Sequence, residues 1–250
     1  MNNDSRDMPS VSTKAQRGSA YRAADNPFLG SRGLVGGSGE KRKHRHNNPY
    51  EHPLLLRPYD VPEHITVARQ LFANGPIEVE IGFGRSHFFR DRVLQAPETQ
   101  FLGFEIKLEW VRRVAKFLAR EDRMDCRVVL DDARPLLLQL LPEESVRVFY
   151  VFFPDPWWKK RHHKRRIMTQ EMLDVMYRLL EPGGAIELRT DVRDYFARVD
   201  ELFQNDARYE RIEPGIDQNG QALPLTHREK KCRETGIDTY SLRARKASQS

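Results

Sequence analysis

From Ile77 onward, the chain alternates short runs of β-branched and aromatic residues with stretches of helical periodicity. The runs predict strands at residues 77–81, 101–105, 127–130, 146–153 and 185–189, with two more near 208–212 and 239–244. Helical patterns cover residues 86–94, 108–120, 134–141, 167–180 and 192–203. Strands separated by helices in this way are typical of a doubly wound sheet. The expected fold class is α/β, a mostly parallel seven-stranded sheet with helices on both faces.

Glycines or acids stand where the predicted strands end. They are Gly82, Gly84, Glu105, Asp132, Asp155 and Asp191. In doubly wound sheets, ligands bind beyond the carboxyl ends of the strands. These residues are therefore candidates for one shared site.

The first predicted strand passes through Glu80 into a glycine turn, Gly82-Phe83-Gly84. Glycines permit a tight turn and close approach of the backbone to a ligand at a helix N-terminus. Glu105 ends the next strand, where a carboxylate can accept hydrogen bonds from both hydroxyls of a ribose. A pairing with Lys107 or Arg112 is the structural alternative for Glu105.

Asp132 closes the third strand, where an adenine would lie in this fold, although it could also cap the helix that follows. The layout suits either a nicotinamide dinucleotide or S-adenosylmethionine. A dinucleotide needs a pyrophosphate seat, normally Gly-x-Gly-x-x-Gly, and His87 stands at its sixth position. Glu80 would repel a pyrophosphate but favour a sulfonium or ammonium group. S-adenosylmethionine is therefore the preferred cofactor.

The stretch from Phe152 to Arg166 reads Phe-Phe-Pro-Asp-Pro-Trp-Trp-Lys-Lys-Arg-His-His-Lys-Arg-Arg. Prolines on both sides make a stiff mount for Asp155. The two tryptophans offer faces on which a nucleobase can stack, and the cations from Lys159 onward suit phosphates. The stretch predicts nucleic-acid binding beside an acid. The plainer alternative is a solvated basic helix start behind a buried strand.

The first 50 residues hold nine Lys/Arg and four Asp/Glu, and nine minus four is a net charge of +5, against +6 for the whole chain. Because such a segment cannot bury enough apolar surface to fold, residues 1–52 are interpreted as a disordered basic arm. The arm would either contact RNA or DNA or act as a solubilising tail. One folded domain is expected at residues 53–245, with a tail at 246–250.

No apolar segment typical of a secretory signal follows Met1, and the apolar runs are too short to cross a bilayer. Cys126 and Cys232 show no metal-ligand spacing and need not pair. We therefore expect a cytoplasmic protein without a metal, a membrane contact or an obligatory protein partner. Its oligomeric state stays open.

Six motifs resemble, in order and spacing, those of bacterial tRNA (guanine-N7)-methyltransferases, which have the Rossmann-like class I methyltransferase fold. They are Glu80–Gly84, Phe101–Glu105, Asp132-Ala133, Phe152–Arg166, Thr190-Asp191 and Thr226-x-x-Glu229. The resemblance covers about residues 75–245. It implies methyl transfer from S-adenosylmethionine to N7 of a guanine in the tRNA variable loop.

The resemblance also implies roles for individual residues. The cofactor would be bound by Glu80, Gly82, Gly84, Glu105, Asp132 and Asp155, and Asp155 would be catalytic. The tRNA or its target guanine would contact Lys159, Asp191, Thr226, His227, Arg228 and Glu229. The chain departs from the family at Ser86, where a glycine is usual, at His227-Arg228, where Lys-Phe is usual, and after Glu229, where the usual Arg-Gly is missing.

The altered segment Thr226–Glu229 leaves open the alternative that the protein methylates another RNA or another base. A non-catalytic RNA-binding module is a further alternative, but pure binding of an anion would not need four carboxylates. Guanine N7 carries a lone pair and no proton at neutral pH, so its attack on a methyl group needs no base. Catalysis would come from proximity and electrostatics, with Asp155 accepting hydrogen bonds from the guanine edge and Asp191 sharing this task.

Overall fold

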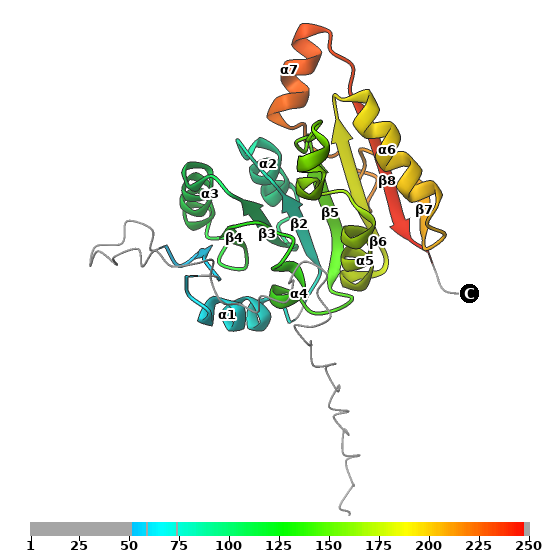
Figure 1. The fold of residues 1–250 in the computed structure, drawn as a ribbon. Coiled ribbons are helices and arrows are strands. Elements are labelled where there is room, and N and C mark those ends of the chain that lie inside the picture. The colour runs from blue at the N-terminus through cyan, green and yellow to red at the C-terminus, as the bar shows by residue number, and fades with distance from the viewer. Residues whose placement is uncertain (1–51, 59, 74, 248–250) are drawn as a thin grey trace, which may run out of the picture.

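One sheet of eight strands forms the centre of the molecule (Figure 1). The computed structural model describes residues 52–58, 60–73 and 75–247. The strand order is β1-β4-β3-β2-β5-β6-β8-β7. The strands are β1 (Leu55–Leu56), β2 (Ile77–Ile81), β3 (Gln100–Glu105), β4 (Arg127–Leu130), β5 (Val146–Phe152), β6 (Leu180–Thr190), β7 (Tyr209–Ile212) and β8 (Tyr240–Lys246). Neighbours are parallel from β1 to β6, and β8 runs antiparallel to β6 and β7. The predicted mostly parallel α/β sheet is confirmed.

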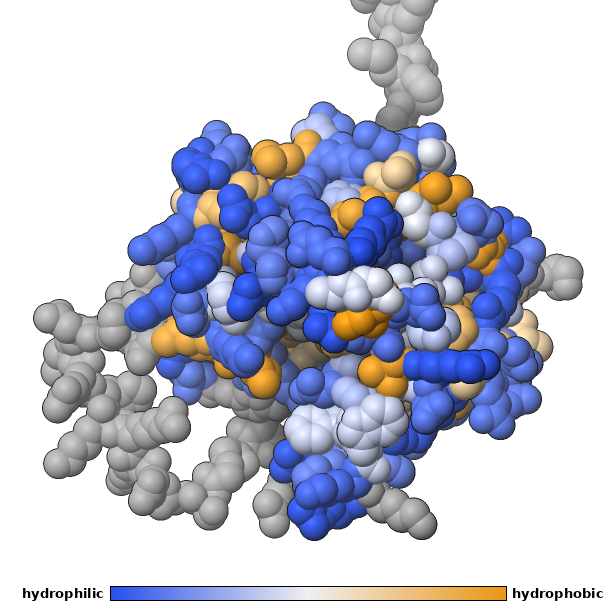
Figure 2. Space-filling view, turned by 90° about the horizontal axis from the view of Figure 1, so that it is seen from above, coloured by the Kyte–Doolittle hydropathy of each residue, from blue (hydrophilic) through white to orange (hydrophobic). Residues whose placement is uncertain are grey.

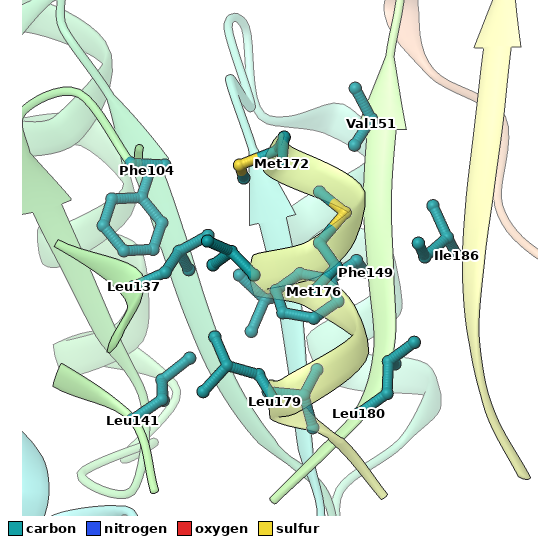
Figure 3. Packing of buried hydrophobic residues seen from close by; sticks show 14 of the residues in the cluster. Phe104, Leu137, Leu141, Phe149, Val151, Met172, Met176, Leu179, Leu180 and Ile186 are labelled. Carbon is teal, nitrogen blue, oxygen red and sulfur yellow. The ribbon is translucent and has the colours of Figure 1, made fainter. Parts of the chain in front are cut away.

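Helices cover both faces of this sheet. They are α1 (Glu63–Leu71), α2 (His87–Gln95), α3 (Leu108–Arg120), α4 (Leu137–Leu140), α5 (Gln170–Leu179), α6 (Arg193–Gln204) and α7 (His227–Thr235), with a 3-10 helix η2 (Lys160–Arg165). One core cluster joins α1, α4, α5 and α6 to the sheet, and a second joins α2 and α3. From Val148 to Phe152, successive residues of β5 belong to opposite clusters, as the two-residue period of a strand requires. Figure 3 shows Met172 and Met176 of α5 packed near Phe149 of β5.

Four elements were not predicted from the sequence. They are the short strand β1, which gives the sheet its eighth strand, the helices α1 and α7, and the 3-10 helix η2. β6 begins at Leu180, five residues before the predicted strand, and so includes the stretch Pro182-Gly183-Gly184 between the predicted helix and that strand. Gly184 makes this possible, because a Cβ atom there would lie 2.8 Å from the carbonyl oxygen of Val146 on β5. The helix predicted at 134–141 shortens to the four residues of α4.

The predicted basic arm at residues 1–52 lies outside the described residues except for His52. At the other end, β8 reaches one residue into the predicted tail. There Lys246 is buried, and its Nζ donates hydrogen bonds of 2.9 Å to Glu144 and to the carbonyl oxygen of Leu180. Within the described ranges, no helix combines the length and the apolar character needed to span a membrane.

The carboxyl ends of the parallel strands meet at one edge of the sheet, and α7 projects from the molecule at this edge (Figure 1). Figure 2 looks onto this end of the molecule, and hydrophilic residues cover most of the surface there. Ligands of doubly wound sheets bind at such an edge. The candidate residues are therefore expected to form a site at this end.

Candidate active site

The turn between β2 and α2 requires glycine because of its backbone conformation. Gly82 and Gly84 have φ angles of 78° and 48°, in the left-handed region that residues with a Cβ atom rarely adopt. Ser86 follows with a φ angle of 61°, at the N-cap position of α2, and its side chain makes no capping bond. A left-handed serine costs about 1 kcal/mol or more. Backbone strain is thus a physical reason for the glycine that is usual at this position.

Glu105, at the end of β3, holds the glycine turn in place. Its Oε2 accepts a hydrogen bond of 2.9 Å from the backbone N–H of Gly84. Its Oε1 accepts a second, also of 2.9 Å, from the backbone N–H of Lys107. The contact with Lys107 is therefore made by the main chain and not by the ammonium group. The turn and the acid, far apart in sequence, form one structural unit.

A cavity of about 650 Å³ opens beyond the carboxyl ends of β2, β3, β4 and β5, and we call it the large cavity. Its volume lies in the range of small-molecule sites. Five residues predicted for the cofactor line it, namely Gly82, Gly84, Glu105, Asp132 and Asp155. Sequence reasoning did not identify other residues that line this cavity, among them Ile106, Trp110, Asp131, Arg134 and Arg165.

The acids at the end of β4 differ in their partners. Asp132 accepts hydrogen bonds of 3.0 Å from the backbone N–H and from Nε of Arg134. It does not cap α4, which begins only at Leu137, so the capping alternative is wrong. Asp131 stands beside it, and burial raises its pKa to about 6. The adjacent pair of aspartates was the signal that could have identified Asp131.

Glu80 lies in the middle of the sheet edge and is nearly inaccessible to solvent. Burial raises its pKa to about 8, although the charge of Arg189 opposes this rise and that of Glu105 adds to it. Within the described part of the chain, its Oε2 has no hydrogen-bond partner. An unsatisfied buried carboxyl oxygen is costly, and a cationic or hydrogen-bonding ligand would relieve that cost.

The loop that carries Asp155 is held in an unusual conformation. Phe153 and Trp157, on either side of the Pro-Asp-Pro triplet, have φ angles of 50° and 44°. Such left-handed residues persist only where the surroundings enforce them, and they concentrate at functional sites. Arg166 supplies part of this enforcement, because it is buried and donates hydrogen bonds to the carbonyl oxygens of Pro156 (2.9 Å) and Trp157 (3.3 Å).

The basic run after this loop divides into two parts. Arg166 turns inward to the loop, and the guanidinium of Arg165 lies 4.9 Å from the centre of the Trp157 ring. Lys159 and Trp158 are exposed instead, and neither lines a cavity. Among the described side chains of the run, Lys159, Arg161 and Arg165 are exposed and can therefore meet a phosphate, whereas Arg166 is buried. The sequence pattern did not reveal this division.

A second cavity of about 250 Å³ adjoins the first, and we call it the small cavity. The two cavities share the lining residues Gly82, Gly84, Phe152 and Phe153. The small cavity is also lined by Glu80 and by the start of α7, namely Thr226, His227 and Arg228. Predicted cofactor residues and predicted substrate residues thus meet at the glycine turn.

His227 and Arg228 are engaged with other side chains in the small cavity. The His227 ring stacks on that of His87 with 4.9 Å between centres, and its Nε2 lies 2.9 Å from Nη1 of Arg85. Burial and then the charge of Arg85 lower the pKa of His227. Arg228 donates a hydrogen bond of 2.9 Å from Nε to Asp191, so Asp191 holds α7 and does not itself line either cavity.

Glu229 is buried and has structural partners. It forms a capping box with Thr226, in which its carboxylate accepts the Thr226 N–H at 2.8 Å and its own N–H donates to Oγ1 of Thr226 at 3.0 Å. Arg189 of β6 donates a further hydrogen bond of 2.9 Å to the same carboxylate. Glu229 therefore fixes the start of α7 to the sheet, and it is not among the residues that line the two cavities.

The fold matches that of solved methyltransferases. The chain superposes on the aminoglycoside resistance methyltransferase NpmB1 with a TM-score of 0.53 over 73% of this chain and 93% of the other. For the 16S rRNA methyltransferase KamB the TM-score is 0.52, over 72% and 92%. Sequence identities of 17% and 14% limit these similarities to the fold. Together with the strand order and the glycine turn, they show the Rossmann-like fold of class I methyltransferases.

Sequence comparison narrows the class to one family. Residues 74–242 match the family model described as "Putative methyltransferase". The tRNA (guanine-N(7)-)-methyltransferase of Rhodopirellula baltica is 33% identical over 78% of this chain and 74% of its own length. That of Thiobacillus denitrificans is 30% identical over 76% and 83%. The chain belongs to the tRNA (guanine-N(7)-)-methyltransferase family, which excludes the nicotinamide alternative.

The family and its fold imply S-adenosylmethionine as the methyl donor, and the residues present fit this molecule. The large cavity can accommodate a nucleoside, Glu105 and the two aspartates of β4 provide acceptors, and the glycine turn permits close approach. Glu80, whose Oε2 is unsatisfied, lines the small cavity and precedes the glycine turn that both cavities share, and its carboxylate suits a cationic group. Among the described residues, no cluster of His, Cys, Asp or Glu is arranged to hold a metal ion.

Proposed function

We propose that this protein transfers the methyl group of S-adenosylmethionine to N7 of a guanine in the variable loop of tRNA, forming 7-methylguanosine. The observation that carries the proposal is the junction of the two cavities at Gly82, Gly84, Phe152 and Phe153. One cavity has the size and the acids for a nucleoside cofactor, and the other opens toward the basic helix α7. A base in the small cavity would face a methyl donor in the large one.

The large cavity would hold the cofactor, whose sulfonium supplies an electrophilic methyl group. Glu105 and the backbone of the glycine turn are tied together, so the turn would be in place before the cofactor binds. Asp131 and Asp132 would accept hydrogen bonds at the β4 end. Glu80, which lines the small cavity next to the shared glycine turn, would face the positive charge of the cofactor from that side and stabilise it as its own carboxyl ionises.

The small cavity would hold the target guanine. Because N7 has a lone pair and no proton, the protein needs to orient the base and not to deprotonate it. Holding two reactants in attack geometry can lower a barrier by about 7–11 kcal/mol. His227 and His87 present a stacked pair of rings at this cavity, and Arg228 is kept in place by Asp191.

Asp155 would act on the charge that appears in the purine as the methyl group is transferred. Methylation at N7 makes the ring cationic, so a carboxylate that accepts hydrogen bonds from its edge gains strength in the transition state. The strained loop and the Arg166 bonds would fix Asp155 before the substrate arrives. The fixed position of Asp155 would therefore depend on the geometry of this loop.

The proposal is tested by incubating the protein with isotope-labelled S-adenosylmethionine and unmodified tRNA, and then mapping the modified nucleoside by mass spectrometry. We expect 7-methylguanosine in the variable loop and no label in a tRNA whose target guanine is replaced by adenine. Ribosomal RNA fragments, offered in parallel, test the alternative of another RNA. Label in those fragments and none in tRNA would overturn the proposal.

The role of Asp155 is tested in the same assay with Asp155→Asn. We expect turnover to fall at least about a hundredfold, in line with the loss of one electrostatic contact to a transition state, while tRNA binding persists. Asp194→Asn, which changes an exposed aspartate on α6, is the matched control and should keep full turnover. Asp155→Asn activity within a few-fold of the parent would remove Asp155 from the mechanism.

A further inference from the structure

α7 buries little apolar surface. Its residues read His-Arg-Glu-Lys-Lys-Cys-Arg-Glu-Thr, and only Glu229 and Cys232 are buried. A helix that is polar on nearly all sides gains little from packing against the protein, so it needs other interactions to stay in place. The helix nevertheless projects from the edge of the sheet (Figure 1).

Specific polar contacts hold α7 rigidly. Its N-terminus is fixed by the capping box and by the bond from Arg189 to Glu229, which is 2.9 Å long and buried. Arg228 is bonded to Asp191 of the β6 end. Its C-terminus closes on Gly236, whose φ angle of 67° is the left-handed conformation usual after helices. Buried charge pairs are poor sources of stability but fix geometry well, so the helix is held in a set orientation.

The outer surface of α7 is cationic. Arg228, Lys230, Lys231 and Arg233 are exposed, whereas the only exposed acid of the helix is Glu234. Lys230 lies 3.9 Å from Asp91 of α2, a contact at the distance limit of an ion pair. Lys231 and Arg233 are the two cations on the outer part of the helix. Exposed cations on a fixed projecting element suit a polyanion.

We propose that α7 is a second tRNA-binding arm, which contacts the phosphate backbone on the side of the target guanine opposite to η2. The proposal rests on the proposed function. The first turn of α7 lines the small cavity, and Arg165 of η2 lines the large one. The two basic elements therefore flank the junction where the base would be methylated. A strand whose base enters the small cavity has cations on both sides.

The test reverses two charges on the outer part of α7 in the full chain, with Lys231→Glu and Arg233→Glu combined. We expect the KM for tRNA to rise about tenfold or more, with kcat at saturating tRNA and the Kd of S-adenosylmethionine unchanged. The slope of log affinity against log salt concentration should fall by about two. Lys116→Glu with Arg120→Glu on the exposed side of α3 makes the same change in net charge and is the matched control.

A milder variant, Lys231→Gln with Arg233→Gln, removes the charges without placing acids at a helix C-terminus, where they would disfavour the helix. It should raise the KM for tRNA several-fold and lower the salt slope to the same extent. Equal KM values and salt slopes for the parent and both α7 variants would overturn the inference, as would an equal effect from the α3 control. Failure of the parent to methylate tRNA would instead overturn the proposed function.

Discussion

The two cavities of this protein are built in different ways. The large cavity is lined by residues at the ends of consecutive strands, and its turn is tied to Glu105 by main-chain hydrogen bonds. The small cavity depends on α7, which is joined to the sheet by the buried pair Arg189–Glu229 and the exposed pair Arg228–Asp191, each between residues about 40 positions apart. The large cavity follows from local sequence and from the topology of the sheet. The small cavity follows from long-range contacts, so we expect it to be the easier of the two cavities to disable selectively.

Buried charged residues also hold residues 213–226, the segment that leads to α7. Glu187 of β6 accepts a hydrogen bond of 2.9 Å from the backbone N–H of Gly215, and Asp217 accepts one of 2.9 Å from Arg92 of α2. Arg92 is itself bonded through two nitrogens to Glu78 of β2. Removing one partner of a buried charged pair costs about 3–5 kcal/mol. The segment that leads to α7 is therefore held by buried charged residues as well as by the core contact of Leu223.

The largest selective effect is expected for Glu229→Ala. The change removes the closest carboxylate from the buried Arg189, which keeps the Pro224 carbonyl oxygen at 3.0 Å and the Glu187 carboxylate at 3.5 Å, and it removes half of the capping box. The free energy of unfolding should therefore fall by about 3 kcal/mol. The KM for tRNA should rise strongly, while the Kd of S-adenosylmethionine stays within about twofold, because the large cavity does not use α7. Chemical denaturation measures the free energy of unfolding, and calorimetric titration measures the Kd of S-adenosylmethionine.

Glu234→Ala, on the same helix but exposed, is the control for Glu229→Ala and should leave all three quantities unchanged. If Glu229→Ala weakened binding of S-adenosylmethionine as much as binding of tRNA, the two cavities would not be separable. A change in tRNA binding without any loss of stability would indicate a direct contact of Glu229 with the RNA.

The next largest effect is expected for Arg166→Lys. Lysine cannot donate to the Pro156 and Trp157 carbonyl oxygens together in the same planar geometry, so Asp155 should lose its fixed position. We expect kcat to fall roughly ten- to hundredfold with little change in the KM for tRNA. Arg161→Lys, exposed in the same basic run, is the control. A raised KM with normal kcat would instead assign Arg166 to RNA binding.

Glu80 should make cofactor binding depend on pH. Its pKa of about 8 keeps the carboxyl protonated at neutral pH, and the positive charge of S-adenosylmethionine favours the ionised form. Affinity should therefore rise as the pH increases from 6 toward about 8, with proton release on binding, and Glu80→Gln should flatten this dependence. Titration calorimetry in buffers of different ionisation enthalpy measures the released proton. Equal pH profiles for parent and variant would contradict the prediction.

Glu80 also links stability to pH. A carboxyl whose pKa is higher in the folded than in the unfolded protein stabilises the fold fully below the unfolded pKa, and this contribution is lost as the pH rises through the folded pKa. For Glu80 the loss should extend from about 4.5 to about 8. The free energy of unfolding of the parent should therefore fall more across this window than that of Glu80→Gln.

The smallest effect is expected for Ser86→Gly in the glycine turn. Glycine removes the cost of the left-handed backbone at this position but adds freedom to the unfolded chain, so the net gain should be up to about 1 kcal/mol. Ser86→Ala keeps the strain and should give no gain. Thermal unfolding of the three proteins makes the comparison, and a gain for alanine equal to that for glycine would rule out backbone strain as the cause.

Much of the fold could be predicted because its signals are local. The strands from β2 to β6, the glycine turn and the acids at the strand ends follow from short-range periodicity and from the geometry of parallel sheets. The short strand β1 has only Leu55 and Leu56 as its signal, and it pairs with β4 far along the chain. A two-residue pattern carries no period, so sequence reasoning could not detect it.

The small cavity, which would hold the methyl acceptor, was less predictable because it too depends on contacts between residues far apart in the chain. The residues of α7 have almost no apolar period, and the helix is stable because of the capping box and of partners on β6. The division of the basic run, with Arg166 turned inward, depends on carbonyl groups ten positions away. Long-range hydrogen bonds of this kind leave no repeating pattern in the sequence.

The central claim is that a guanine N7 in the small cavity attacks a methyl group held at the junction of the two cavities. The most direct test uses a tRNA in which only the target guanosine is replaced by 7-deazaguanosine, a change that exchanges N7 for a C–H group. We predict that this tRNA binds with the affinity of the parent tRNA and receives no methyl group from S-adenosylmethionine. Methylation of the 7-deaza tRNA at that nucleotide, at a rate near that of the parent, would contradict the account.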